Sequence, residues 1–151
     1  MRKTISVIAF AMSIAVVNTS CNKTKTNSKR LDGGEWNVTE LSVDGVNEAE
    51  LPHLKFSECD AYDETCTGDW TSHEGGKGNF AWQFREKGET FEISNQSELS
   101  GDHATDEAIL QCQNFSGVYE VIERTKKNME FKTTKALGFV GQSVIIKMEK
   151  E

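Results

Sequence analysis

The cysteines are the residues of this chain whose chemistry depends most on spacing. The sequence has 4 of them, at Cys21, Cys59, Cys66 and Cys112. No two stand in a C-x-x-C arrangement, so neither a redox motif nor a zinc ribbon is supported. Cys59 follows one strand-like stretch and Cys66 precedes the next, with a short acidic segment between them. We therefore predict a Cys59–Cys66 disulfide at a hairpin tip, which leaves Cys112 as the odd thiol.

Histidines and carboxylates are the next candidates for a metal site. The 3 histidines, His53, His73 and His103, lie far apart, without the close pairing of a metal-binding helix or loop. We interpret them as solvated loop residues. The segment SECDAYDETCTGD is rich in carboxylates, but it lacks the EF-hand order of ligands and glycine. The sequence therefore predicts no metal site, and this segment is interpreted as a solvated acidic loop.

Catalytic motifs give no support for an enzyme. A nucleophile needs a base and an orienting group nearby, yet the chain contains neither Gly-x-Ser-x-Gly nor the usual companions of a Ser-x-x-Lys motif. The GGKGN segment lacks the spacing of a phosphate-binding loop. Carboxylates occur throughout the chain and so mark no acid–base pair. We expect no catalytic residue, no cofactor and no enzymatic activity.

The N-terminus has the order of an export signal. Arg2 and Lys3 precede an apolar stretch from Ile5 to Val17, and small residues then lead to Cys21. The apolar stretch is shorter than the about 20 residues that span a bilayer, and it suits a secretory signal. The segment resembles a bacterial lipoprotein signal, in which the cysteine is lipidated after cleavage. We predict a signal peptide at 1–20 and lipidation of Cys21; ordinary secretion is the alternative.

Residues 21–32 are polar and basic, with almost no apolar side chain. Such a segment cannot bury enough surface to order itself, so we predict a flexible tether behind the lipid anchor. The lipoprotein resemblance implies acyl chains, such as palmitate, that hold Cys21 at a membrane. No aspartate follows Cys21, which by the sorting pattern of Gram-negative lipoproteins implies the outer membrane, facing the periplasm. That compartment is oxidising and permits the predicted disulfide.

The rest of the chain has the pattern of a single all-β domain. The sequence has 151 residues, a net charge of −7 and 1 proline, which suits one domain with a real core and argues against a nucleic-acid partner. Apolar and polar residues alternate in short runs between turn residues, while long helical periodicity is missing. We predict an antiparallel up-and-down barrel, closed or partly open, over 33–151; a two-sheet sandwich is the main rival.

Four segments together resemble a known family. GEWNVTELSVDG carries a Gly-x-Trp pattern at Gly34 and Trp36, and FSGVYEV, MEF and VIIKMEK follow later. This pattern, over roughly Asp32 to Glu149, resembles lipocalin-like lipoproteins of Gram-negative envelopes. The resemblance implies that Trp36 closes one end of a barrel and that ligands enter at the other. The chain departs from the family in lacking the Thr-Asp-Tyr motif and, near its C-terminus, the arginine that packs on the first-strand tryptophan.

Aromatic residues alternate along the expected strands. Alternation predicts that Phe80, Trp82 and Phe84 point inward, whereas Gln83 and Arg85 point outward. An eight-stranded barrel can be filled by side chains or can hold one small ligand. Two functions therefore stay open. One is a non-catalytic module that binds a small apolar ligand; the other is an accessory subunit with a filled barrel that docks on another envelope protein. The predicted ligand contacts are Phe80, Trp82, Phe84, Phe91, Tyr119 and Phe131.

Overall fold

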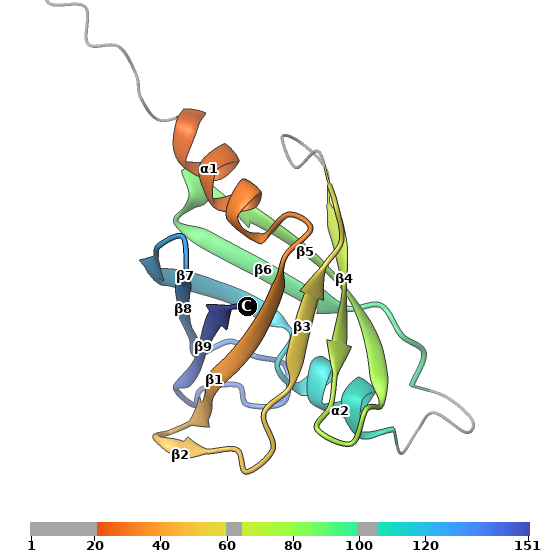
Figure 1. Ribbon diagram of the computed structural model, residues 1–151. Helices are drawn as coiled ribbons and strands as arrows, with labels where there is room; N and C mark the ends of the chain where they lie inside the picture. The colour runs from red at the N-terminus through yellow and green to blue at the C-terminus, as the bar shows by residue number, and fades with distance from the viewer. Residues whose placement is uncertain (1–20, 60–64, 100–105) are drawn as a thin grey trace, which may run out of the picture.

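The computed structural model of the chain is a closed, antiparallel, 8-stranded barrel (Figure 1). It describes residues 21–59, 65–99 and 106–151. The predicted signal peptide at 1–20 lies outside the described residues, as do His103 and the acidic segment at 60–64. The all-β fold expected from the alternating pattern is confirmed.

The barrel strands follow one another around the wall in chain order, and β1 pairs with β9 to close the ring. This is the up-and-down arrangement, and its closure excludes the sandwich and the partly open barrel. A short strand, β2 (Val46–Asn47), pairs with the end of β1. The barrel strands are β1 (Glu35–Val43), β3 (His53–Phe56), β4 (Cys66–Thr71), β5 (Lys77–Arg85), β6 (Thr90–Asn95), β7 (Gly117–Arg124), β8 (Asn128–Thr133) and β9 (Val144–Lys150).

Strand β1 contains the bulge that its sequence pattern indicates. Its pairing with β9 shifts register between Val38 and Glu40, so Val38 and Leu41 are both buried although they stand on opposite parities. The strand then ends in a turn at Asp44–Gly45, where both residues have positive φ, 50° and 79°. Such a turn joins tightly paired strands, here β1 and β2.

Helix α1 (Cys21–Leu31) covers one end of the barrel, which we call the α1 end (Figure 1). The prediction of a flexible tether at 21–32 was therefore wrong. Leu31 is fully buried, and the buried Asn27 donates a hydrogen bond of 3.0 Å to the carbonyl of Gly88, which lies in the 3-10 turn η1 (Glu86–Gly88). The scarcity of apolar residues in 21–32 was a poor guide here, because polar side chains such as Asn27 form contacts that hold the helix against the barrel.

Helix α2 (Glu107–Asn114) covers the opposite end, the α2 end. Asp106 begins it as an N-cap, accepting hydrogen bonds from the backbone N–H groups of Ala108 and Ile109. The helix lies against the start of β5, where a Cβ on Gly78 would stand 3.3 Å from the Ala108 carbonyl oxygen. Neither described helix is long and apolar enough to cross a bilayer.

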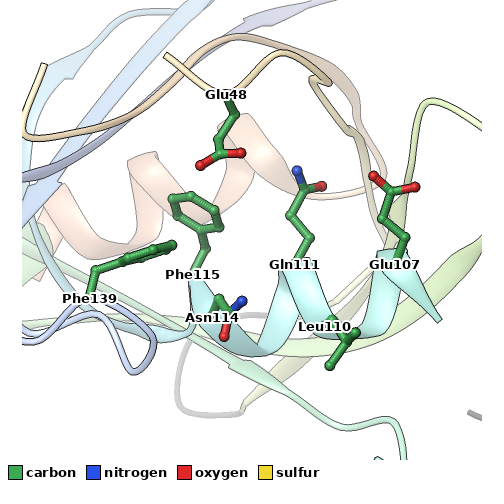
Figure 2. Close-up of a pocket in the computed structure, with 7 residues that line it drawn as sticks. All are labelled: Glu48, Glu107, Leu110, Gln111, Asn114, Phe115 and Phe139. Carbon is green, nitrogen blue, oxygen red and sulfur yellow. The ribbon is translucent and has the colours of Figure 1, made fainter. Parts of the chain in front are cut away.

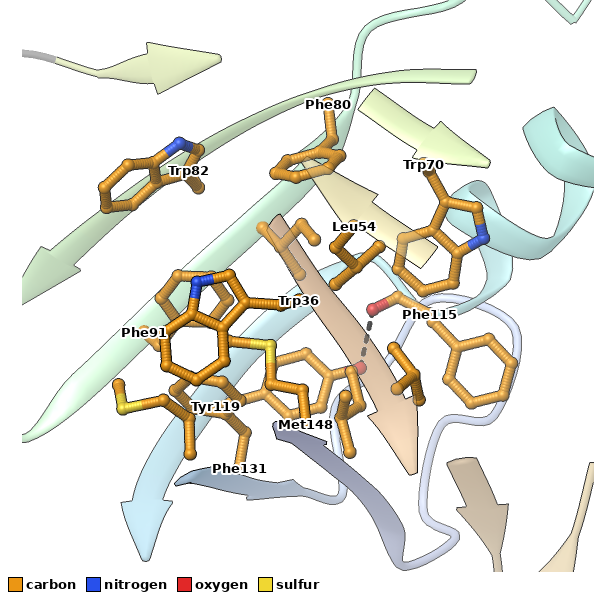
Figure 3. Packing of buried hydrophobic residues seen from close by; sticks show 14 of the residues in the cluster. Trp36, Leu54, Trp70, Phe80, Trp82, Phe91, Phe115, Tyr119, Phe131 and Met148 are labelled. Atoms are coloured by element: carbon orange, nitrogen blue, oxygen red, sulfur yellow. Dashed lines mark hydrogen bonds between the residues drawn. The ribbon is translucent and has the colours of Figure 1, made fainter. Parts of the chain in front are cut away.

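The barrel interior is filled with aromatic side chains (Figure 3). Phe91 and Phe131 stack with their centroids 4.4 Å apart, and Phe56 meets Trp82 edge to face at 5.3 Å. The expected inward row is confirmed, because Phe80, Trp82 and Phe84 are buried while Gln83 is half-buried and Arg85 exposed. Trp36 is also a core residue, as the lipocalin resemblance implied.

Candidate functional site

A cavity of about 400 Å³ lies at the α2 end, beside helix α2 (Figure 2). Three segments that are far apart in the sequence form it: the loop before β3, helix α2 with the residue after it, and the β8–β9 loop. We call it the mouth pocket. Its lining residues are Glu48, Glu107, Leu110, Gln111, Asn114, Phe115 and Phe139.

Two phenylalanines form the apolar floor of the mouth pocket. The Phe115 and Phe139 rings have centroids 5.0 Å apart, and Phe115 also stacks on Trp70 of the core at 6.4 Å. The floor is thereby continuous with the barrel core. The close approach of Gly138 to Asn114 holds the β8–β9 loop against α2, since the Gly138 N–H donates a 2.9 Å hydrogen bond to the Asn114 carbonyl.

Gln111 connects the mouth pocket to its surroundings through both ends of its amide. Its Nε2 donates to the Glu50 carbonyl at 3.1 Å, and its Oε1 accepts from the indole N–H of Trp70 at 2.9 Å. This amide is therefore structural: it ties the loop before β3 to α2. The other polar groups of the lining are the amide of Asn114 and the carboxyl groups of Glu48 and Glu107.

The carboxyl group of Glu107 is in an acidic neighbourhood. A hydrogen bond with Glu50, together with partial desolvation and the charge of Glu74, raises the pKa of Glu107 above its usual value, while His73 opposes this effect. Carboxyl groups from two other segments, those of Glu50 and Glu74, thus lie near Glu107 without being part of the pocket lining.

All six aromatic residues predicted to contact a ligand lie in the barrel interior. Their exposed fractions range from 0% for Phe80 and Tyr119 to 7% for Phe84. None of the six lines the mouth pocket. The structure therefore brings these residues together as a packed core, and their contact with a ligand stays a prediction.

The cysteines are placed as their spacing indicated. Cys59 and Cys66 form a disulfide with a Cα–Cα distance of 5.8 Å, which confirms the predicted pairing. Cys112 is a free, buried cysteine on α2, and burial raises the pKa of its thiol to about 12. Cys21 is the first residue of α1; its lipidation stays a prediction.

His53 is not the solvated loop residue that the sequence suggested. It lies on β3, and its Nε2 is 4.0 Å from Glu35 Oε2 and 3.8 Å from Glu151 Oε1. These three donor atoms lie within 4.8 Å of one another and could approach a divalent cation. However, Lys55 Nζ already pairs with Glu35 at 2.9 Å. The interpretation was wrong because adjacent strands bring together residues far apart in the chain; His73, in contrast, is exposed in a turn as expected.

A second cavity, of about 260 Å³, lies beside α1 and is basic. Its cations are engaged in internal contacts. Arg30 donates to the Asn27 side chain and to the Arg124 carbonyl, while Glu89 pairs with both Lys23 and Arg124 at 3.1 and 3.2 Å. These contacts attach α1 to the barrel, so we interpret this cavity as part of a structural ion-pair network.

Sequence reasoning missed the mouth pocket. Phe115 and Phe139 are separated by two strands, and Glu48 by much of the barrel, so spacing gave no indication that they meet. The useful signal was the segment AILQCQNF, whose helical form places several pocket residues on one short element.

No protein-family model and no curated protein matches this chain. Among solved structures, it is similar to a de novo designed fluorescence-activating β-barrel, with a TM-score of 0.47 and 12% identity over 83% of this chain and 98% of that one. It is also similar to a protein from Burkholderia xenovorans solved by NMR, with a TM-score of 0.46 and 9% identity over 100% and 99% of the two chains. Neither likeness is close enough to indicate a family or a function.

Proposed function

We propose that this chain is a non-catalytic binding module that holds a small, largely apolar ligand in the mouth pocket. The observation that carries the proposal is the contrast between a packed interior and a pocket with an aromatic floor outside it. A volume of about 400 Å³ falls within the roughly 300–1,000 Å³ of small-molecule sites. A phenylalanine floor with a few polar groups around it also has the usual composition of such a site.

The absence of catalysis is part of this proposal. The mouth pocket is lined by carboxyl, amide, aliphatic and aromatic groups, and among these residues no hydroxyl or thiol nucleophile stands beside a base. The buried thiol of Cys112 is held protonated by desolvation, which opposes a nucleophilic role. Binding is therefore the activity that the pocket supports.

The proposed setting is the bacterial envelope, with the chain carried on a lipid anchor at Cys21. Helix α1 begins at Cys21 and covers the end of the barrel opposite α2 (Figure 1). An anchor there would leave the mouth pocket facing away from the membrane, open to ligands. The exposed basic side chain of Lys29 on α1 suits an anionic membrane surface. We place the protein at the outer membrane, facing the periplasm.

The lipid anchor is tested by replacing the cysteine. We expect Cys21→Ser to move the protein from the membrane fraction to the soluble fraction, and the acyl mass to be missing from its N-terminal peptide. Cys112→Ser is the matched control and should stay with the membranes. A Cys21→Ser variant that still fractionates with membranes would contradict the anchor and leave pocket binding untouched.

Ligand binding is tested with the neutral alcohol 1-naphthylmethanol, followed by fluorescence, and by native mass spectrometry of protein purified from its own envelope. We expect Phe139→Ala to weaken the alcohol about tenfold, because the variant removes part of the apolar floor. Val140→Ala is the control, since Val140 is the next residue and is 75% exposed. Equal loss in both variants, or no binding by the unaltered protein, would contradict the proposal.

The second candidate is an accessory subunit that docks on another envelope protein, and the packed interior favours it over a ligand held inside the barrel. Trp82→Ala distinguishes a ligand held in the mouth pocket from a ligand held inside the barrel. A ligand in the mouth pocket is retained by this variant, whereas a ligand inside the barrel is lost from it. A co-purified protein, with no small molecule and no response to Phe139→Ala, would favour the accessory subunit.

A further inference from the structure

The mouth pocket combines an aromatic floor with a rim of one charge sign. Glu48 reaches in from the loop before β3, and Glu107 rises from α2 on the other side of the same space (Figure 2). Among the residues that the structure describes, the lining contains neither lysine nor arginine. The rim can therefore attract a positive charge and repel a negative one, while the floor accepts an apolar group.

Glu107 at this rim interacts with two carboxyl groups outside the pocket lining, those of Glu50 and Glu74. The hydrogen bond with Glu50 is the largest cause that raises the pKa of Glu107, followed by desolvation and by repulsion from the charges of Glu50 and Glu74. Among the described residues, the charge of His73, in the exposed β4–β5 turn, acts in the opposite direction. A cation bound between these carboxylates would relieve this repulsion, so the free pocket already favours the charge of such a ligand.

The floor can contribute to the same selectivity. The half-buried ring of Phe139 lies over that of the buried Phe115, with their centroids 5.0 Å apart, and an ammonium group within about 6 Å of the Phe139 centroid is attracted by the face of the ring. Leu110, beside them, adds an aliphatic surface. The negative charge at the rim and the apolar surface at the floor thus favour a ligand that carries both a positive charge and an apolar group.

We infer that the mouth pocket selects organic cations, that is, an ammonium group carried on a small apolar body. This inference rests on the proposed binding function and adds the chemical class of the ligand. The carboxylates of Glu107 and Glu48 pair with the ammonium group, while the half-buried Phe139 and the exposed Leu110 pack against the apolar body.

The test compares three probes with the same ring and different charge: 1-naphthylmethylammonium, 1-naphthylmethanol and 1-naphthoate. We expect the ammonium to bind at least tenfold more tightly than the alcohol, and the carboxylate to bind most weakly. The affinity of the ammonium should fall as salt is added, whereas that of the alcohol should not. Equal affinities for ammonium and alcohol would overturn the inference and leave the proposed binding function standing.

Variants identify the groups responsible. Glu107→Gln and Glu48→Gln should each weaken the ammonium about fivefold and leave the alcohol unchanged, because only the charge is removed. Glu123→Gln, which makes the same change on an exposed position of β7, should alter neither. If Glu107→Gln weakens both probes equally, or if the preference for the ammonium survives loss of both pocket carboxylates, the inference is overturned.

Discussion

The Nζ atom of Lys150 lies over the indole ring of Trp36, 5.9 Å from its centroid. The sequence analysis found no arginine near the C-terminus to pack on Trp36, and Lys150 supplies a cation in that position. Gly34 completes the arrangement, because a Cβ at this position would stand 2.8 Å from Trp36 Nε1. Gly34, Trp36 and Lys150 therefore act together to close the α1 end of the barrel.

Removing the charge of Lys150 tests this contact. We expect Lys150→Met to lower the free energy of unfolding by about 0.5–1 kcal/mol, the usual size of a cation–π contact near the surface. The methionine keeps an apolar stem over the ring, so the loss reports the ammonium group, which also donates a hydrogen bond of 3.5 Å to the Arg30 carbonyl. Lys150→Arg should retain the stability. Urea unfolding measures both, with Lys132→Met on β8 as the control; equal losses for Lys150→Met and Lys150→Arg would contradict a cation–π contact.

Breaking the Cys59–Cys66 disulfide should destabilise the fold moderately. The two residues are 7 apart in the sequence, and closing a loop of this size stabilises a protein by about 2.5 kcal/mol in the chain-entropy model. We expect Cys59→Ala with Cys66→Ala to lose about that amount in urea unfolding. Added reductant should lower the stability of the unaltered protein and leave that of the double variant unchanged. A reductant effect on the double variant would implicate another bond.

Trp82 tests whether the interior is a packed core. Trp82 is 1% exposed and its Nε1 donates to the Thr67 carbonyl at 3.0 Å. We expect Trp82→Ala to cost about 3–5 kcal/mol, the range for deleting a large buried side chain. The half-buried Gln83, next along β5, is the control, and Gln83→Ala should cost far less. A loss near zero for Trp82→Ala would mean that the tryptophan does not fill the interior.

The barrel itself was predictable because alternation along a strand is a local property. Phe80, Trp82 and Phe84 stand two residues apart, and any sheet that buries one of them buries all three. The same holds for the bulge near Glu40, where a change of parity in the sequence requires an extra residue in the strand. Turns such as Asp44–Gly45 follow from residue type alone.

The site was not predictable because it depends on contacts between distant segments. The floor of the mouth pocket needs Phe115 and Phe139 on the same side of α2, and the cluster around His53 needs Glu151 beside β1. Helix α1 failed as a prediction for a different reason. The helix is held to the barrel in part by a hydrogen bond from the Asn27 side chain to the Gly88 carbonyl. A hydropathy pattern gives no indication that a polar side chain will be buried with a hydrogen-bond partner.

The buried thiol of Cys112 and the buried phenol of Tyr119 make the fold sensitive to alkaline pH. Desolvation raises the pKa of Cys112 from 9.0 to about 12, and it also raises the pKa of Tyr119. An acid whose pKa is higher in the folded protein than in the unfolded chain stabilises the fold fully below the unfolded pKa. That contribution is lost as the pH rises towards the folded value. We therefore expect the free energy of unfolding to decrease between about pH 9 and pH 12.

Cys112→Ala isolates the contribution of the thiol to this pH dependence. A difference of about 3 pKa units corresponds to a loss on the order of 4 kcal/mol over the whole range, so the variant should lose distinctly less stability between pH 9 and pH 11.5 than the unaltered protein. The comparison is between slopes, because the variant also leaves a small cavity that lowers its stability at every pH. Urea unfolding at a series of pH values measures the slopes. The same slope in both proteins would show that ionisation of the Cys112 thiol does not contribute to the loss of stability at alkaline pH.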